Sequence, residues 1–422
     1  MNGRVLFILI LVFWSGLTAQ ALPVAETPDV LVEEALARNP RLQELKQKWA
    51  ADEAVIPRAG ALPDPIMSLN LLNLPVESLA FNQEPMTGKQ IAVKQTFPFW
   101  GKLDTRQTIA EKGAEASRAM YQEACNRLIQ DVRVAWLDIA FADRALDITA
   151  QNRDLMREYV KIAEQKYAVG RGLQQDVLKA QVELSKLEDK WLTWQRKRAT
   201  LAARLNRLLN RPAGQPFGPT SPLAFIPLHT VIDSLRKQVK THRPLLKAAR
   251  FRVAQSAERI DLARKAYGPD ITLFAAYTQR DMLQNGVGGA DFVSGGVSFN
   301  VPLYFWRKQR KQVEENTLRY EGARQAYLEV ENKALFTLES VWESLQEEMQ
   351  RLELYQTGII PQASQALNAA LTAYQTDKVD FLTLINQQLT LFNFELEYER
   401  ILNDYLKNRA RLEYVTGRRL KQ

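Results

Sequence analysis

The sequence is poor in the residues that carry most enzyme chemistry. Its 422 residues include one cysteine, Cys125, and two histidines, His229 and His242. A single cysteine excludes an internal disulfide framework, and neither histidine has a metal-binding partner at a suitable spacing. The sequence has no glycine-rich phosphate loop and no nucleophile elbow. We therefore expect a protein that is not an enzyme and that has no cofactor and no metal site.

Long apolar runs are also scarce. The run Val5–Trp14 follows Arg4 and is too short to cross a bilayer as a helix. It is followed by Ala19-Gln20-Ala21, a small-x-small pattern typical of a signal-peptide cleavage site. We therefore expect residues 1–21 to be a signal peptide and the mature chain to act outside the cytoplasm.

Neither sign of charge dominates the sequence. It has 56 Lys and Arg against 48 Asp and Glu, a formal net charge of +8. The basic residues are spread over predicted helix faces rather than gathered in one patch. Nucleic-acid binding is therefore not expected.

The sequence contains an internal duplication. Several residues recur in the same order at a nearly constant spacing, and the pairs are Pro40 and Pro244, Pro65 and Pro269, Pro98 and Pro302, Trp136 and Trp342, Tyr167 and Tyr374, and Arg211 and Arg418. We expect a first repeat over residues 22–211 and a second over 230–422. The linker, residues 212–229, holds five prolines and two glycines, which predicts little regular structure.

Each repeat contains two segments that alternate between apolar and small or polar residues. These segments are Ile66–Leu71, Gln90–Phe97, Ile271–Thr278 and Val293–Val301. One apolar face and one polar face is the weak pattern of strands in a membrane β-barrel. A soluble sheet on a core would show the same alternation, but the sequence offers no second sheet or short helix to cover it.

Aromatic residues cluster where each strand pair runs into the next helix. They are Phe97, Phe99, Trp100, Tyr304, Phe305 and Trp306. Aromatic side chains are enriched at membrane–water interfaces. An ordinary aromatic corner between a strand and a helix is the alternative, and we favour the interface.

Long helices are the strongest secondary-structure prediction. Apolar residues recur every three or four positions between Leu128 and Tyr167, which is a heptad-type seam. We expect one helix from about Val30 to Leu62, and a hairpin of helices from Leu103 to Tyr167 and from Gln174 to Leu209. The second hairpin should run from Lys308 to Thr376 with a kink at Pro361, and return to Thr416.

Four strands cannot close a barrel, because the smallest membrane barrels have about eight. An open sheet edge in lipid would leave backbone groups unpaired, each costing several kcal/mol. Membrane strands in this chain therefore require oligomerisation, and a trimer would supply twelve strands. The long helices would continue such a barrel as a second, helical tube.

The layout resembles the TolC-type outer-membrane efflux duct family over essentially the whole mature chain. Similar features are Asn39-Pro40-x-Leu42, the strand end Gln95–Leu103, Tyr167-x-x-Gly170 before Asp176-Val177, and the echo Tyr374-x-x-Asp377. The resemblance implies a mainly helical fold with membrane strands. In it, a duplicated unit of a strand pair and long helices forms a trimeric, twelve-stranded β-barrel continued by a helical α-barrel.

The resemblance also implies partners and a location. It implies a homotrimer in outer-membrane lipid of a Gram-negative bacterium, extending into the periplasm. It further implies a periplasmic adaptor (membrane fusion) protein and an inner-membrane pump of the resistance-nodulation-division type. The stretch Asn73–Val76 and Gln83–Lys89 resembles the heavy-metal branch, which favours metal cations as substrate. Glu84 and Met86 are expected to be structural parts of this loop rather than a binding site.

The turns of the two helical hairpins are the expected periplasmic gate or adaptor-docking site. The candidate residues are Gly170, Arg171, Gly172, Asp176, Val177, Asp377, Lys378 and Asp380. The charged members are expected to pair across protomers and to narrow the aperture. General drug efflux, a type I protein-secretion duct and a periplasmic coiled-coil scaffold without a pore are the alternatives.

Overall fold

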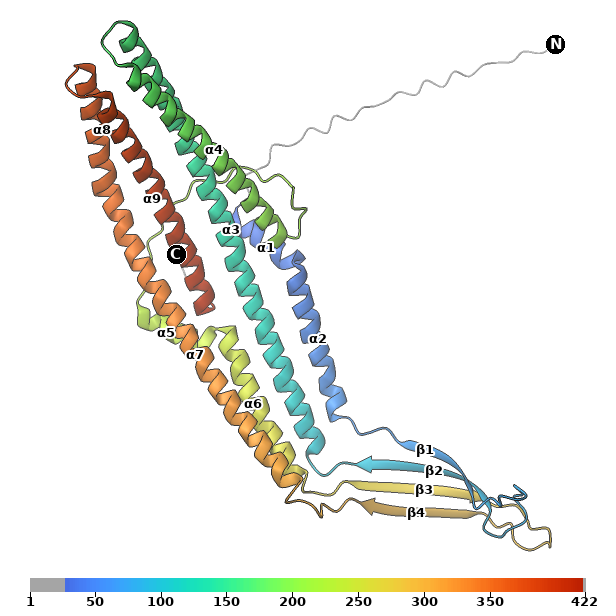
Figure 1. Ribbon diagram of the computed structural model, residues 1–422. Helices are drawn as coiled ribbons and strands as arrows, with labels where there is room; N and C mark the ends of the chain where they lie inside the picture. Colours follow the sequence, from blue (N-terminus) through green and yellow to red (C-terminus); the bar gives the residue numbers. More distant parts are fainter. Residues whose placement is uncertain (1–26, 420–422) are drawn as a thin grey trace, which may run out of the picture.

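The computed structural model describes residues 27–419 (Figure 1), so the expected signal peptide lies outside the described residues. One order of elements occurs twice: two short helices, two strands and two long helices. The first half contains α1 (Pro28–Arg38), α2 (Pro40–Gly60), β1 (Ile66–Leu72), β2 (Gly88–Phe97), α3 (Lys102–Ala168) and α4 (Gln174–Leu208). The second contains α5 (Ile232–His242), α6 (Pro244–Lys265), β3 (Ile271–Gln279), β4 (Phe292–Phe299), α7 (Gln309–Leu354), the π-helix η1 (Tyr355–Ile359), α8 (Ile360–Gln375) and α9 (Phe381–Thr416).

The first predicted helix is two helices, so that prediction was wrong. Asn39 breaks it with extended geometry (ψ 120°), because a residue before proline is biased away from the helical region. The Asn39 side chain then accepts hydrogen bonds from the backbone N–H groups of Arg41 and Leu42 and caps α2. Arg243 and Pro244 produce the same break between α5 and α6.

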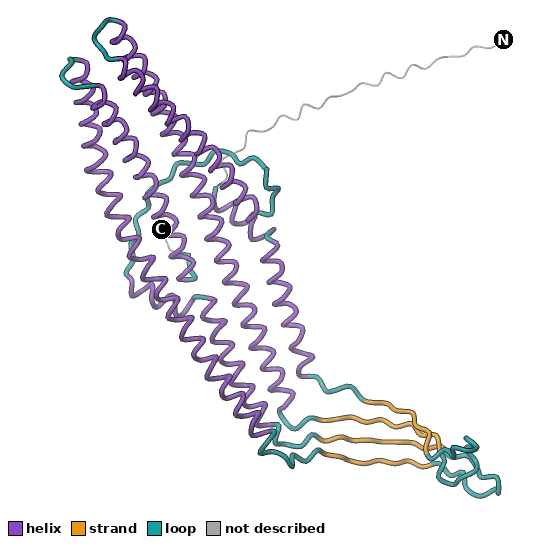
Figure 2. Tube along the Cα trace, in the orientation of Figure 1, coloured by secondary structure: helices purple, strands orange, loops and turns teal. Residues whose placement is uncertain are grey.

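The four predicted strands form one antiparallel sheet in the order β1-β2-β3-β4 (Figure 2). In one register row Asn70 pairs with Gln90 and Gln90 with Thr278, and their side chains hydrogen-bond across the strands. The next row pairs Leu69 with Ile91, both of them exposed. In the described part of the chain, β1 and β4 each have one partner strand, so the sheet has two open edges.

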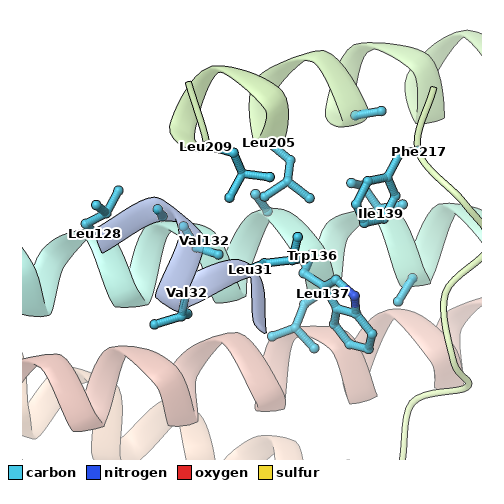
Figure 3. Close-up of a cluster of buried hydrophobic side chains, with 14 of the residues drawn as sticks. Leu31, Val32, Leu128, Val132, Trp136, Leu137, Ile139, Leu205, Leu209 and Phe217 are labelled. Carbon is cyan, nitrogen blue, oxygen red and sulfur yellow. The ribbon is translucent and has the colours of Figure 1, made fainter. Parts of the chain in front are cut away.

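The long helix α3 organises the helical half of the molecule. Its 67 residues span roughly 100 Å at about 1.5 Å per residue, as the sequence predicts. In Figure 3, Val132 and Trp136 of α3 lie against Leu31 of α1 and Leu205 of α4, and Phe217 of the linker joins the same buried cluster. Within residues 27–419, no helix has the length and apolar character needed to span a membrane.

The second long helix runs without a break from Gln309 to Gln375, close to the predicted Lys308 to Thr376. Its irregularity near Pro361 is the five-residue π-helix Tyr355–Ile359, which lies between α7 and α8. The backbone N–H of Ile360 bonds to the carbonyl of Tyr355, five residues earlier. Pro361 follows directly, and the residue four positions earlier, whose carbonyl its ring would clash with in a regular α-helix, is Thr357 of the π-helix. The wider turn is how the chain accommodates the proline that the sequence singles out.

Candidate functional site

The turns of the two helical hairpins lie at the same end of the molecule, opposite the sheet (Figures 1 and 2). One turn joins α3 to α4 and the other joins α8 to α9. Below them, a buried cluster that includes Met156, Leu187, Phe381 and Phe392 packs all four helices together. The turns are therefore held on a packed base.

Both turns close with the same backbone motif. After α3, the Arg171 N–H bonds to the Lys166 carbonyl and the Gly170 N–H to the Tyr167 carbonyl. After α8, the Lys378 and Asp377 N–H groups make the equivalent bonds, and both patterns are Schellman motifs. Gly170 and Asp377 occupy the left-handed position, with φ of 71° and 59°. Asp377 thus replaces the glycine of the first copy and holds a strained conformation that aspartate tolerates better than most residues.

Lys166 joins the two turns. Its Nζ lies 2.6 Å from Oδ1 of Asp377 and donates a 2.9 Å hydrogen bond to the Tyr374 carbonyl. The same Nζ sits 4.1 Å from the centre of the Tyr374 ring. The bond from Lys166 holds the pKa of Asp377 below its ordinary value. Lys166 was missed at the sequence level, because nothing in the pattern of α3 separates it from other polar helix residues.

The other predicted residues of the two turns lie at separate positions, each with its own local role. Asp380 caps α9 by accepting hydrogen bonds from the backbone and side chain of Thr383, and this lowers the pKa of Asp380. Asp176 lies in the first turn of α4 and Val177 packs on the buried cluster. A Cβ on Gly172 would lie 3.0 Å from the backbone nitrogen of Tyr167, which explains glycine there.

Arg171 and Lys378 are exposed. Among the described residues neither forms an ion pair. Both carboxylates of the second turn, by contrast, are engaged within the chain, Asp377 with Lys166 and Asp380 with Thr383. Any pairing of Asp377 or Asp380 across protomers would therefore compete with these bonds.

A buried polar trio lies below the tips, between α3 and α9. Tyr159 donates a 3.1 Å hydrogen bond to Gln388, which donates a 2.7 Å bond to Asn152. Asn152 in turn donates to the Ile148 carbonyl. Buried polar groups that satisfy one another fix a unique register between two helices, so this trio sets the alignment of the two hairpins.

The predicted interface aromatics lie at the other end of the helices, next to the sheet. Trp100 is 85% exposed, Tyr304 70%, Phe305 48%, Trp306 49% and Phe97 38%. Phe99 differs, because it covers Gly268 and a Cβ there would lie 2.3 Å from its ring. Five of the six aromatic side chains are thus available to surroundings outside the chain.

A clamp between the two halves fixes this junction. Lys102 is buried and its Nζ lies 2.7 Å from Oδ1 of Asp270, which also accepts a 2.7 Å hydrogen bond from the Phe99 N–H. Lys102 donates a second bond to the Gly268 carbonyl. The clamp ties the start of α3 to the loop before β3. The strand-end motif of the sequence therefore contains a structural lysine.

The loop between β1 and β2 carries Glu84 and Met86, and Met86 is 69% exposed. Asn73 and Thr87 close the base of the loop through hydrogen bonds, and Arg280 from the β3–β4 loop donates to the Pro85 carbonyl. Among residues 27–419 no group of three or more His, Cys, Asp or Glu side chains is placed to hold a metal ion.

The chain matches the sequence model of the family described as Outer membrane efflux protein over residues 31–211 and again over residues 235–418. It therefore belongs to the outer membrane efflux protein family. The Cobalt-zinc-cadmium resistance protein CzcC of Cupriavidus metallidurans is 22% identical over 321 residues, 75% of this chain and 74% of the relative. The Toxin and drug export protein A of Aggregatibacter actinomycetemcomitans is 22% identical over 237 residues, 56% of this chain and 52% of the relative.

The fold agrees with solved members of this class. A crystal structure of CusC, from a study of its folding and transmembrane channel formation, superposes with a TM-score of 0.79 at 15% identity and covers 96% of both chains. Together with the family match, this places the protein in the outer membrane of a Gram-negative bacterium, extending into the periplasm. The resemblance to efflux ducts and the mainly helical fold with a small sheet are confirmed. The protein is an efflux channel of a class whose members are not enzymes.

Proposed function

We propose that the protein is the passive exit duct of a tripartite efflux system and that it works as a homotrimer. The main evidence for this proposal is the four-stranded sheet with its two open edges. Four strands with two open edges lie beside exposed aromatic residues and lead into helices about 100 Å long. Three copies would join β4 of one protomer to β1 of the next and close twelve strands, which satisfies the edge groups in lipid.

The two halves, residues 22–211 and 230–422, then act as equivalent repeats around the duct axis. The repeated order of elements and the double match to the family support this division. Each protomer would contribute two hairpin tips to the periplasmic end. The tips are proposed as the aperture and as the docking site for a periplasmic adaptor and a pump of the resistance-nodulation-division type.

The tip geometry supports a role in narrowing the aperture. Asp377 holds a left-handed conformation and is bonded to Lys166, so the second hairpin is fastened to the first. Strained residues that the surroundings hold in place are typical of switch regions. Loosening this link would let the hairpins move apart.

We propose heavy-metal cations as the substrate class. The resemblance of the β1–β2 loop and the similarity to a cobalt-zinc-cadmium resistance protein support this choice. General drug efflux is the second candidate, because a toxin and drug export protein is also a relative. A duct needs little chemistry of its own, so the pump would select the cargo, and Glu84 and Met86 need not bind it.

Deleting the gene is expected to sensitise cells to copper, silver, zinc, cobalt or cadmium more than to dyes and detergents. The measurement is growth inhibition, with a plasmid-borne wild-type copy as the control. A plasmid copy carrying both Glu84→Ala and Met86→Ala should restore resistance almost fully. Equal or greater sensitivity to dyes would move the assignment to drug efflux. Unchanged sensitivity to every compound would contradict a role as an efflux exit.

A further inference from the structure

Four cations gather at the start of α7, directly after the exposed aromatic residues. Arg307, Lys308, Arg310 and Lys311 are all exposed, and no carboxylate occurs in the sequence between Asp291 and Glu314. Basic residues elsewhere in the sequence are scattered over helix faces, and this cluster is a local exception.

Carboxylates of the described residues balance only part of this charge, through Glu314 near Lys311 and Arg310. Among the described residues, Lys311 pairs with Glu314 at 2.7 Å, whereas Arg307, Lys308 and Arg310 form no ion pair. The helix also begins without a side-chain cap and without an acidic residue in its first turn. Cations at a helix N-terminus are unfavourable by about 0.3–1 kcal/mol each, because that end of the helix dipole is positive. The Arg310 N–H of this first turn bonds to the Phe305 carbonyl, so the unbalanced feature is the clustered side-chain charge, which an external anion would relieve.

The first repeat provides an internal comparison. There the corresponding lysine, Lys102, is buried and bonded to Asp270, and Asp104 occupies the first turn of α3. The chain therefore neutralises one junction internally and leaves the other charged. If long helices simply required solvated cations at their first residues, both junctions would carry exposed, unpaired cations.

The aromatic residues identify the kind of anion. Tyr304, Phe305 and Trp306 lie one to seven residues before the four cations, and the ring centres of Phe305 and Trp306 are 5.3 Å apart. The Phe305 ring also lies 6.4 Å from Tyr267 at the end of α6, near the exposed Arg264. Aromatic rings of this kind settle at headgroup level, and basic residues beside them attract anionic lipid at about 1 kcal/mol per cation.

We propose that Arg307, Lys308 and Arg310 form a site for the phosphate headgroup of an anionic phospholipid in the periplasmic leaflet of the outer membrane. The proposal rests on the proposed membrane position of the sheet. In the trimer, three such sites would surround the junction between barrel and helices and would fix its depth in the membrane.

The test measures lipid retained by the detergent-purified complex in native mass spectrometry. Wild-type protein titrated with dioleoylphosphatidylglycerol should bind it in preference to dioleoylphosphatidylcholine. The triple variant Arg307→Gln, Lys308→Gln and Arg310→Gln should bind phosphatidylglycerol roughly 10- to 100-fold more weakly. The matched control is Lys46→Gln, Lys48→Gln and Lys333→Gln, three exposed lysines on the helices away from the sheet, and it should bind as the wild type does.

Several results would overturn the proposal. The triple variant could retain as much phosphatidylglycerol as the wild type, or the control variant could lose as much as the triple variant. The wild type could also show no preference for the anionic lipid. Displacement of the lipid by equimolar inorganic phosphate would show that the site takes a free anion instead. Single-channel conductance of the triple variant should match that of the wild type. If the triple variant has normal conductance and binds lipid as the wild type does, only the proposed lipid site is contradicted. If the wild type forms no channels at all, the proposed function as a duct is contradicted.

Discussion

Replacing Lys166 with methionine is expected to raise the single-channel conductance of the protein in planar bilayers several-fold. The substitution removes the 2.6 Å bond to Asp377 and the 2.9 Å bond to the Tyr374 carbonyl, which together hold the second hairpin against the first. Both bonds come from the single Lys166 ammonium, so one substitution removes them together. Three copies of the variant would release this link three times around the aperture.

The chain supplies matched controls for this experiment. Lys161 lies on the same helix, is exposed and forms no ion pair among the described residues, so Lys161→Met should leave conductance unchanged. Asp377→Asn should raise conductance less than Lys166→Met, because Lys166 keeps its bond to Tyr374. Asp380→Asn should have no effect, since asparagine caps a helix as well as aspartate does. Wild-type conductance in Lys166→Met would show that the link does not limit the aperture.

Raising the pH from about 5 to about 8 is expected to destabilise the protein through Glu348, and Glu348→Gln should remove this loss. Glu348 of α7 is buried. Its Oε1 accepts a 2.8 Å hydrogen bond from Asn408 of α9, while its Oε2 has no partner among the described residues. Burial raises the pKa of Glu348 to about 7, the Asn408 bond opposes the rise, and nearby Asp404 and Glu347 add to it.

The direction of the stability change follows from the pKa of Glu348 in the folded chain and its ordinary value in the unfolded chain. Below the ordinary value of 4.5 the carboxyl is protonated in the folded and unfolded chain alike, and it has no pH-dependent effect. As the pH rises from 4.5 through 7, the unfolded chain releases the proton first, so stability falls. The full loss is on the order of 3 kcal/mol for each chain.

Thermal unfolding of the purified complex at both pH values provides the measurement. Glu348→Gln keeps an oxygen for the Asn408 hydrogen bond and carries no charge. It should therefore unfold at nearly the wild-type temperature at the lower pH and a few degrees higher than wild type at the upper pH. The exposed Glu343 on the same helix provides the control, and Glu343→Gln should follow the wild type at both. A constant difference between Glu348→Gln and wild type would contradict the account.

Much of the fold could be predicted because its signals are local and repeated. The alternation in Ile66–Leu71 and its three counterparts gave all four strands, since side-chain direction in a strand depends only on position. The heptad-type seam predicted the length of α3. The prediction was wrong at Asn39, where the proline effect on the preceding residue and the cap outweighed helical periodicity. The irregularity near Pro361 was predicted, but its form as a π-helix at Tyr355–Ile359 was not, because that form does not depend on apolar spacing.

Only part of the candidate site could be predicted from the sequence. The turn residues were found because glycine and aspartate mark chain reversals. Lys166, Lys102 and Glu348 were missed, because each owes its role to a partner more than fifty residues away: Asp377, Asp270 and Asn408. Without the fold, such residues look like ordinary polar positions on a helix.

The most direct test of the central claim is the mass of the purified complex in native mass spectrometry. The two open edges of the sheet predict that the protein needs detergent for extraction and that it has the mass of three chains. It should keep that mass at detergent concentrations that dissociate weak assemblies. A complex that leaves the membrane in salt or alkali alone, or that has the mass of one chain, would contradict the account.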